Sequence, residues 1–143
     1  QPKIRKVKLL HPDAVLPLKK YKLDAGFDVF AIEDVNLKPR EVQKIPLGIS
    51  VEVFFGEMMS IRSRSSTKLK GVSCLDTTCD AGYTGQLFAF IINHSDKEVS
   101  FKKGDRIVQL VFHKIEVEKD MVVTESHLSE SERGDKGFGS SGF

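Results

Sequence analysis

The strongest constraint on the fold is an alternation of apolar and polar side chains between residues 43 and 55. Every second position of this segment is apolar, which gives the series Ile45, Leu47, Ile49, Val51, Val53 and Phe55. Successive side chains of a β-strand point to opposite faces of its sheet, so a period of two places all six on one face. The pattern predicts one long, half-buried strand whose polar face meets solvent.

Shorter segments of similar character recur along the chain, separated by turn residues. They are residues 3–10, 58–61, 87–92, 107–115 and 121–123. Segment 87–92 is apolar on both faces, so we expect it to be buried between two layers. Only residues 65–70 have a helical pattern. Many short strands at intervals of about 8–12 residues predict an all-β fold, either a sandwich or a barrel.

Length and charge bound the class of protein. A chain of 143 residues fits one domain with a core of its own. Its 22 basic and 20 acidic side chains leave a formal charge of +2, which points to neither a nucleic-acid nor a membrane partner. The longest apolar run, residues 87–92, is far shorter than the ~20 residues of a membrane-spanning helix.

The cysteines indicate the redox compartment. Cys74 and Cys79 are the only two, too few for a secreted disulfide scaffold. We therefore expect a reducing compartment: the cytoplasm, or the host-cell interior or nucleus if the chain is viral. With His94 and His113 the cysteines form no recognisable zinc spacing, so we expect buried, inert thiols.

The last fifteen residues, 129–143, differ from the rest. Four glycines and four serines accompany only two apolar side chains. Such a segment buries too little to offset its ordering entropy, so alone it should be mobile. We therefore divide the chain into a β-domain, residues 1–128, and a flexible arm, residues 129–143. The arm is either a frayed end or a lid, and Arg133 and Phe138, set among glycines, favour a lid that orders on a ligand.

Two segments suit phosphate chemistry and the orientation of water. Residues 62–68 (RSRSSTK) place arginines beside hydroxyls, which suits phosphate oxygens, although a solvated basic turn has the same composition. Asp80 opens a turn at 80–85, where its carboxylate either caps the turn or orients a water at a pocket rim. Asp76 is the weaker candidate for that second role.

Two further segments carry charged side chains at strand starts. Asp24 and Asp28 are ligand types that Mg²⁺ uses, often through retained water, although a charged turn explains them equally well. In the segment 104–110, the simplest role of Asp105 and Arg106 is to pair with each other at the surface. No phosphate-binding loop, dinucleotide fingerprint or nucleophile elbow is present.

Five segments, in order along the chain, resemble the five motifs of the trimeric dUTPase family. They are AGFDV (25–29), RSS (64–66), DAGYTG (80–85), GDRIVQL (104–110) and RGDKGFGSSG (133–142), so the match covers nearly the whole chain. The resemblance implies an antiparallel β-barrel of jelly-roll type that forms a homotrimer, with each active site at a subunit interface and closed by a neighbour's C-terminal arm. It also implies hydrolysis of dUTP to dUMP and pyrophosphate, with Mg²⁺ bound to the triphosphate.

The resemblance also implies roles for residues at the matching positions. Asp80 would activate the attacking water, and Tyr83 would pack under the deoxyribose and exclude a 2′-hydroxyl. Asp28 would hold a water bound to Mg²⁺. The hairpin backbone around 80–87 would read the uracil edge, and Phe138 would stack on the base. The positions expected to contact phosphates are Arg64, Ser65, Ser66, Gln109, Arg133, Ser140 and Ser141, with Gly139 adding a backbone donor.

Two alternatives stay open at this point. A homologous fold deaminates dCTP with a Glu ten residues beyond the position of Asp80, but here that position is Phe90. The other alternative is a regulatory module that binds nucleotide without turnover. Ammonia release from dCTP would identify the first, and nucleotide binding without pyrophosphate release would identify the second.

Overall fold

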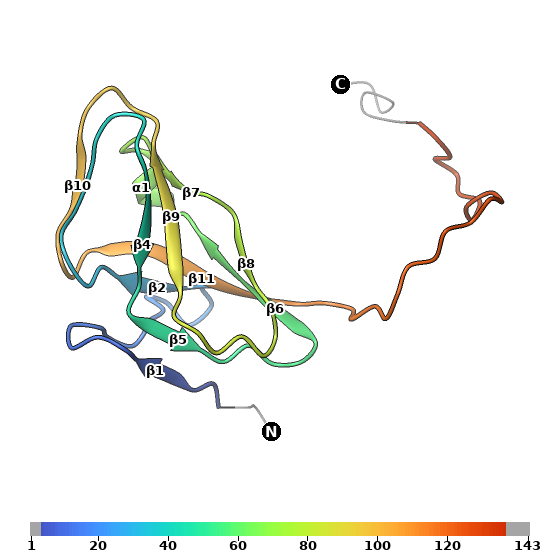
Figure 1. Cartoon of the computed structure of the whole chain (residues 1–143), viewed down its shortest axis with the longest axis horizontal. Coiled ribbons are helices and arrows are strands. Elements are labelled where there is room, and N and C mark those ends of the chain that lie inside the picture. The colour runs from blue at the N-terminus through green and yellow to red at the C-terminus, as the bar shows by residue number, and fades with distance from the viewer. Residues whose placement is uncertain (1–3, 137–143) are drawn as a thin grey trace.

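A computed structural model describes residues 4–136, and short β-strands make up nearly all of the regular structure in that range (Figure 1). The single helix found there, α1 (Ser65–Lys68), lies between β6 and β7. The strands are β1 (Val7–Leu9), β2 (Gly26–Phe30), β3 (Val35–Leu37), β4 (Val42–Pro46), β5 (Ile49–Val51), β6 (Glu57–Arg62), β7 (Val72–Cys74), β8 (Thr77–Cys79), β9 (Phe88–Asn93), β10 (Val99–Phe101) and β11 (Arg106–Lys114).

Every strand pair among the described residues is antiparallel, which confirms the all-β antiparallel prediction. The largest sheet has the strand order β2-β11-β6-β8, and the others have the orders β4-β9-β7, β1-β5 and β10-β3. Their inward faces share one apolar core. Its large, fully buried side chains include Leu37, Leu47, Met59, Ile61, Phe101, Ile107 and Leu110.

The long strand predicted between residues 43 and 55 is in fact two strands, β4 and β5. The break falls at Gly48, whose φ of +72° lies in the left-handed region that favours glycine. The bend changes the partner, because β4 pairs with β9 whereas β5 pairs with β1. The apolar series still faces the core on both sides of the bend, and only its last member, Phe55, is exposed.

The prediction that residues 87–92 are buried on both faces is wrong for one face. Ala89 and Ile91 of β9 are fully buried, whereas Phe88 and Phe90 are half-buried and line a cavity. The strands β3, β7, β8 and β10 escaped prediction because each has only three residues and, unlike β1 and β5, none lies within a longer alternating segment.

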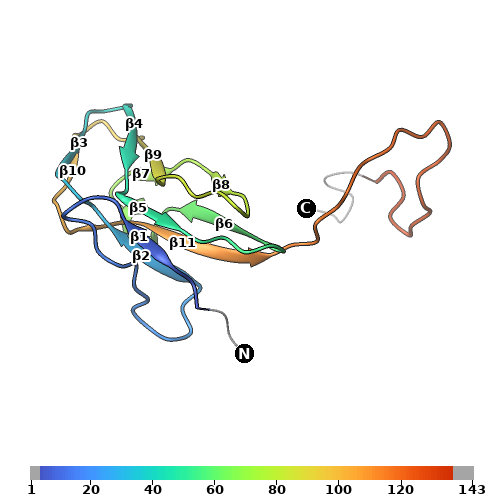
Figure 2. The same cartoon turned by 60° about the horizontal axis from the view of Figure 1, so that its bottom comes forward.

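After β11 the chain leaves the sheets and runs away from them (Figures 1 and 2). Residues 115–136 are all exposed and contain no strand. The strand predicted at 121–123 is therefore wrong for the isolated chain, where Met121, Val122 and Val123 are about nine-tenths exposed. An apolar run becomes a strand only where a neighbouring strand supplies hydrogen bonds, and this run has no such neighbour. No helix in the described range is long and apolar enough to span a membrane.

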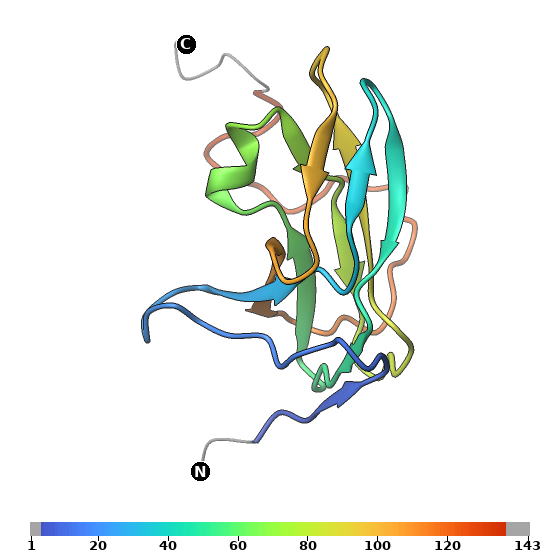
Figure 3. The same ribbon diagram turned by 90° about the vertical axis from the view of Figure 1, so that its left-hand side faces the viewer.

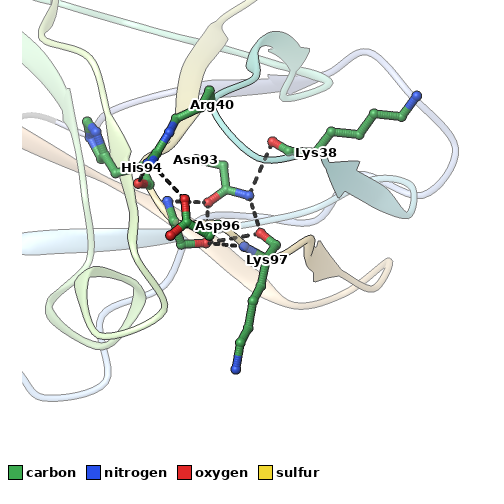
Figure 4. A network of polar contacts seen from close by, with 7 residues as sticks. Lys38, Arg40, Asn93, His94, Asp96 and Lys97 are labelled. Atoms are coloured by element: carbon green, nitrogen blue, oxygen red, sulfur yellow. Dashed lines mark hydrogen bonds and ion pairs between the residues drawn. The ribbon is translucent and has the colours of Figure 1, made fainter.

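A buried asparagine ties the end of β9 to two neighbouring turns (Figure 4). The Asn93 side-chain amide donates to the carbonyls of Leu37, Lys38 and Lys97, at 3.0, 3.2 and 2.7 Å. Its carbonyl accepts the backbone N–H and the hydroxyl of Ser95, at 2.9 and 2.8 Å. Every polar atom of this fully buried side chain therefore has a partner.

We expect Asn93→Ala to lower the free energy of unfolding by about 3 kcal/mol, because it strands buried carbonyls without a donor. Asn36→Ala is the matched control, since the contacts of Asn36 with Glu98 and Ser100 are exposed; that change should cost under about 0.5 kcal/mol. Urea denaturation at one fixed protein concentration measures both values. Equal losses in the two variants would show that the Asn93 network is not a stability determinant.

Candidate functional site

A polar cavity of about 500 Å³ lies between the start of β2, helix α1 and β11. It brings together six residues singled out from the sequence: Asp24, Asp28, Arg64, Ser65, Ser66 and Gln109. The sequence patterns missed Lys20, Tyr21 and Arg106 as members of this cavity. Lys20 and Tyr21 lie on the loop before β2, and nothing local in the sequence shows that this loop borders the same cavity as α1.

The carboxylate of Asp28 is the centre of the charges in this cavity, which we call the basic cavity. Its Oδ1 accepts a hydrogen bond from Arg64 Nε at 3.0 Å, and its Oδ2 lies 3.4 Å from Arg106 Nη1. Asp28 and Arg64 are both largely buried. A carboxylate held between two guanidinium groups fixes their orientation, which prepares the remaining N–H groups for phosphate oxygens.

The expected surface pair of Asp105 with Arg106 is wrong. The Asp105 carboxylate accepts the backbone N–H of Lys102 at 2.8 Å and so closes the turn before β11. Arg106 instead reaches across to Asp28, because β11 and β2 are antiparallel neighbours in the sheet. Sequence adjacency suggested the first pairing, whereas strand register decides the second.

Hydrogen bonds from β11 and β7 hold the segment that carries Arg64. The Gln109 side chain donates from Nε2 to the Ser63 carbonyl at 2.9 Å, and the Ser63 hydroxyl accepts the N–H of Cys74 at 2.8 Å. The buried Thr67 hydroxyl donates to the Arg64 carbonyl at 2.9 Å. Arg64 also donates to the Ser66 hydroxyl at 3.0 Å, which sets this serine beside the guanidinium.

A second cavity, of about 210 Å³, lies beside the turn that follows β8. Asp80 and Tyr83 line it together with Thr77, Thr78, Phe88 and Phe90, and its lining is mostly apolar. Asp80 is the only carboxylate among the lining residues, and no hydrogen bond or ion pair within the described chain occupies that carboxylate. We call this space the aromatic cavity.

The Tyr83 ring is fixed against its own hairpin. Its hydroxyl donates to the Gln86 carbonyl at 2.8 Å. Gly85 permits this close approach, since a Cβ on Gly85 would lie 2.4 Å from the Tyr83 hydroxyl oxygen. Tyr83 therefore presents a positioned ring, about half exposed, at the edge of the aromatic cavity.

The two cavities share no lining residue, and the sheet register shows why. Asp28, Gln109 and Arg62 stand at one level across β2, β11 and β6, while Asp80 follows Cys79 at the level beyond Met59. With about 3.3 Å per residue and 4.8 Å between strands, the Asp28 and Asp80 Cα atoms are roughly 19 Å apart. They occupy diagonally opposite corners of the sheet.

The remaining predicted site residues lie on the C-terminal segment. Arg133 is exposed, and its Nε donates to the Lys136 carbonyl at 2.6 Å, so it joins neither cavity in the isolated chain. Phe138, Gly139, Ser140 and Ser141 lie outside the described residues.

The two cysteines are free thiols without a catalytic setting. Burial raises the pKa of the Cys74 thiol to about 11. Burial and the charge of Asp80 also raise the pKa of Cys79. Both groups are therefore protonated at neutral pH, whereas a nucleophilic cysteine needs a thiolate.

The donor set fits a metal ion only if the substrate supplies most of the ligands. No cluster of three or more His, Cys, Asp or Glu side chains occurs in the described part of the chain. The basic cavity offers two carboxylates, Asp24 and Asp28, and the second is held by two arginines. Mg²⁺ bound by phosphates needs few protein carboxylates and keeps several waters, so this set fits an Mg²⁺ that is bound mainly by phosphates and that Asp28 would contact through water.

Comparison with known proteins supplies the family. The dUTPase family model matches residues 13–142. The deoxyuridine 5′-triphosphate nucleotidohydrolase of Nautilia profundicola is 40% identical over 140 residues, covering 96% of this chain and 97% of the relative. The Clostridium tetani protein of the same name is 41% identical over 143 residues, with 96% and 95% covered.

Solved structures give the same result. The dUTPase of Staphylococcus bacteriophage 80alpha with dUPNHPP superposes with a TM-score of 0.92 at 32% identity, covering 99% of this chain and all of the other. A variant dUTPase of phage phi11 of S. aureus, described with a coordinated structural Mg(II) ion, matches with a TM-score of 0.82 at 25% identity and covers 89% of this chain. A shared fold, a family model over nine-tenths of the chain and two cavities that carry the motif residues lead to one conclusion: this chain belongs to the dUTPase family.

Proposed function

We propose that this chain hydrolyses dUTP to dUMP and pyrophosphate by attack of a water, activated by Asp80, on the α-phosphorus. The observation that carries the proposal is the single unpaired carboxylate of Asp80 at the edge of a mostly apolar cavity lined by Tyr83, Phe88 and Phe90. Such a cavity suits a pyrimidine nucleoside, and the carboxylate suits a water beside it. Family membership and the relatives' shared activity support the same reaction.

In the proposed step, Asp80 accepts a proton from the water as its oxygen bonds to the α-phosphorus. The bond between that phosphorus and the α–β bridging oxygen breaks, and pyrophosphate leaves. Arg64, Ser65, Ser66 and Gln109 hold phosphate oxygens and take up the charge that grows on them. Asp28 would hold a water bound to Mg²⁺ on the triphosphate, and that ion would supply further charge neutralisation.

Specificity would come from the turn that carries Asp80. The Tyr83 ring, which its hydrogen bond to the Gln86 carbonyl holds in place, would leave no room for a 2′-hydroxyl. Backbone groups of residues 80–87 would pair with the uracil edge, and cytosine reverses its donor and acceptor. A deaminase would need a second carboxylate in this cavity, but Phe90 stands where the related enzyme has its Glu. With Asp80 as its one carboxylate, this cavity suits hydrolysis of dUTP better than deamination of a cytosine ring.

A complete site requires more than one chain. Asp80 has to lie within about 3 Å of the attacking water while the basic cavity holds phosphates of the same substrate, but the two cavities share no lining residue and the Cα atoms of Asp28 and Asp80 are roughly 19 Å apart. The phosphate half of the site on one chain would therefore meet the Asp80 half of another. Such a contact joins two different surfaces, and contacts of this kind close into rings. We propose the homotrimer that the family resemblance implies.

The segment after β11 would complete each site from a neighbouring chain. Within the described range, hydrogen bonds of residues 116–136 go only to other residues of the same segment, and its apolar side chains at 121–123 are bare. A neighbour would cover these side chains in the trimer. The arm, residues 129–143, would then carry Arg133, Ser140 and Ser141 to the phosphates and Phe138 to the uracil.

The proposal predicts that dUTP is the preferred substrate of the chain among dUTP, UTP, dCTP and dTTP. Pyrophosphate release with Mg²⁺ is the measurement, and kcat/KM for dUTP should exceed that for dCTP by a factor on the order of 10⁴. Ammonia release from dCTP would identify a deaminase instead. Tight binding of dUTP with no pyrophosphate release would identify a module without turnover.

Asp80→Asn should keep dUTP binding and lower kcat about a thousandfold, because the amide cannot accept the proton of the attacking water. Asp76→Asn is the control, since Asp76 is exposed and does not line the aromatic cavity. Calorimetric binding of a non-hydrolysable dUTP analogue separates lost chemistry from lost affinity. A kcat near that of the unmodified chain would remove Asp80 from the mechanism.

Mixed assembly of two inactive variants tests the shared site. Chains with Asp80→Asn keep the basic cavity, and chains with Arg64→Gln keep the aromatic cavity. If one site draws these halves from different chains, trimers formed from an equal mixture should recover about one quarter of full activity. Each variant alone is the control. A mixture as inactive as its components would place both halves of the site within one chain.

A further inference from the structure

The loop before β2 places a lysine on the rim of the basic cavity. Figure 3 shows this loop, in blue, projecting from the sheets on the same side of the view as α1. Its base is closed by Leu18 and Asp28, whose backbones exchange hydrogen bonds of 3.1 and 2.7 Å. Its tip is closed by Asp24, whose carboxylate accepts the N–H of Tyr21 at 2.9 Å. Lys20 is thus carried by an anchored loop rather than by a free end.

Lys20 gives the basic cavity its net positive charge. Three cationic side chains, Lys20, Arg64 and Arg106, line the cavity with two carboxylates, Asp24 and Asp28. Without the lysine the lining would be formally neutral. Arg64 and Arg106 are both engaged by Asp28. Within the described residues no carboxylate pairs with the Lys20 ammonium, which lies 5.5 Å from the centroid of the Tyr21 ring.

Its neighbour Lys19 provides a contrast on the same loop. The Lys19 ammonium lies over the Phe27 ring, 4.8 Å from the centroid, and the residue does not line the basic cavity. The two lysines therefore carry the same charge at adjacent positions, but only Lys20 borders the cavity. Comparing variants of the two lysines therefore distinguishes a specific contact at the basic cavity from a general effect of positive charge on this loop.

We infer that Lys20 binds the outer phosphates of the triphosphate. This inference rests on the proposed function and adds a residue outside the five motif segments. The α-phosphorus has to lie beside the Asp80 water of another chain, which leaves the β- and γ-phosphates for the rim of the basic cavity. An ammonium without a carboxylate partner is the donor there that is free to meet them.

A cation at the rim would bind the phosphates equally well in the ground state and in the transition state. Its removal should therefore raise KM and leave kcat unchanged. Lys20→Ala should therefore raise KM for dUTP about tenfold, with kcat as in the unmodified protein. It should weaken binding of Mg²⁺-pyrophosphate by a similar factor and leave dUMP binding unchanged. Raising the salt concentration should narrow the difference, because the contact is exposed. Lys20→Arg should restore most of the affinity.

The experiment compares Lys20→Ala, Lys20→Arg and Lys19→Ala as full-length trimers. The measurements are dUTP kinetics and calorimetry with Mg²⁺-pyrophosphate and with dUMP. Equal changes in the Lys19 and Lys20 alanine variants, or unchanged pyrophosphate affinity in Lys20→Ala, would overturn the inference. If the unmodified chain fails to hydrolyse dUTP but binds pyrophosphate in a manner that depends on Lys20, the proposed function fails and the Lys20 assignment stands.

Discussion

Backbone hydrogen bonds hold β6 between β8 and β11, and the register of these two ladders decides where the chemistry lies. Met59, Ile61 and Leu110 are fully buried on the inward face of this sheet. A slip of one residue would turn these side chains outward and bring polar neighbours such as Gln109 into the core, so burial fixes the register. The same register sets Asp28 and Asp80 at opposite corners of the sheet. Core packing therefore determines the geometry of the site.

The basic cavity owes its order to Asp28. A largely buried carboxylate needs positively charged partners. Asp28 has two, Arg64 at the N-cap of α1 and Arg106 at the start of β11. Together with Asp24, the other carboxylate of the cavity lining, Asp28 balances the charge of the two guanidinium groups. In the proposed site, phosphate binding needs a further cation, and Lys20 on the anchored loop would supply it. The arginines, held in place by Asp28, would orient hydrogen-bond donors toward the phosphates, while the lysine would add the positive charge that attracts them.

The sequence predicted the parts of this protein that depend on local pattern. Alternation revealed the strands around β4, β5 and β6, and the order of the motifs revealed the family. Pairing was out of reach, because contacts such as Arg106 with Asp28 depend on which strands become neighbours. The bend at Gly48 was hidden because both halves of the series keep one face in the core. The separation of the two cavities also follows from register, which a motif does not encode.

The failed strand prediction at 121–123 and the divided site have the same physical origin. The apolar segment 121–123 has no partner strand within one chain, and the Asp80 carboxylate, which we propose to be catalytic, lies in a different cavity from the residues proposed to bind phosphate. Association of identical chains would remedy both at once, since burial of the segment lowers the free energy of the assembly that also unites the two halves of the site. In this proposal, burial of the apolar side chains at 121–123 between chains drives assembly, and catalysis depends on that assembly. A chain with both halves on one face would need no partner, and its C-terminal segment would have no reason to carry exposed valines.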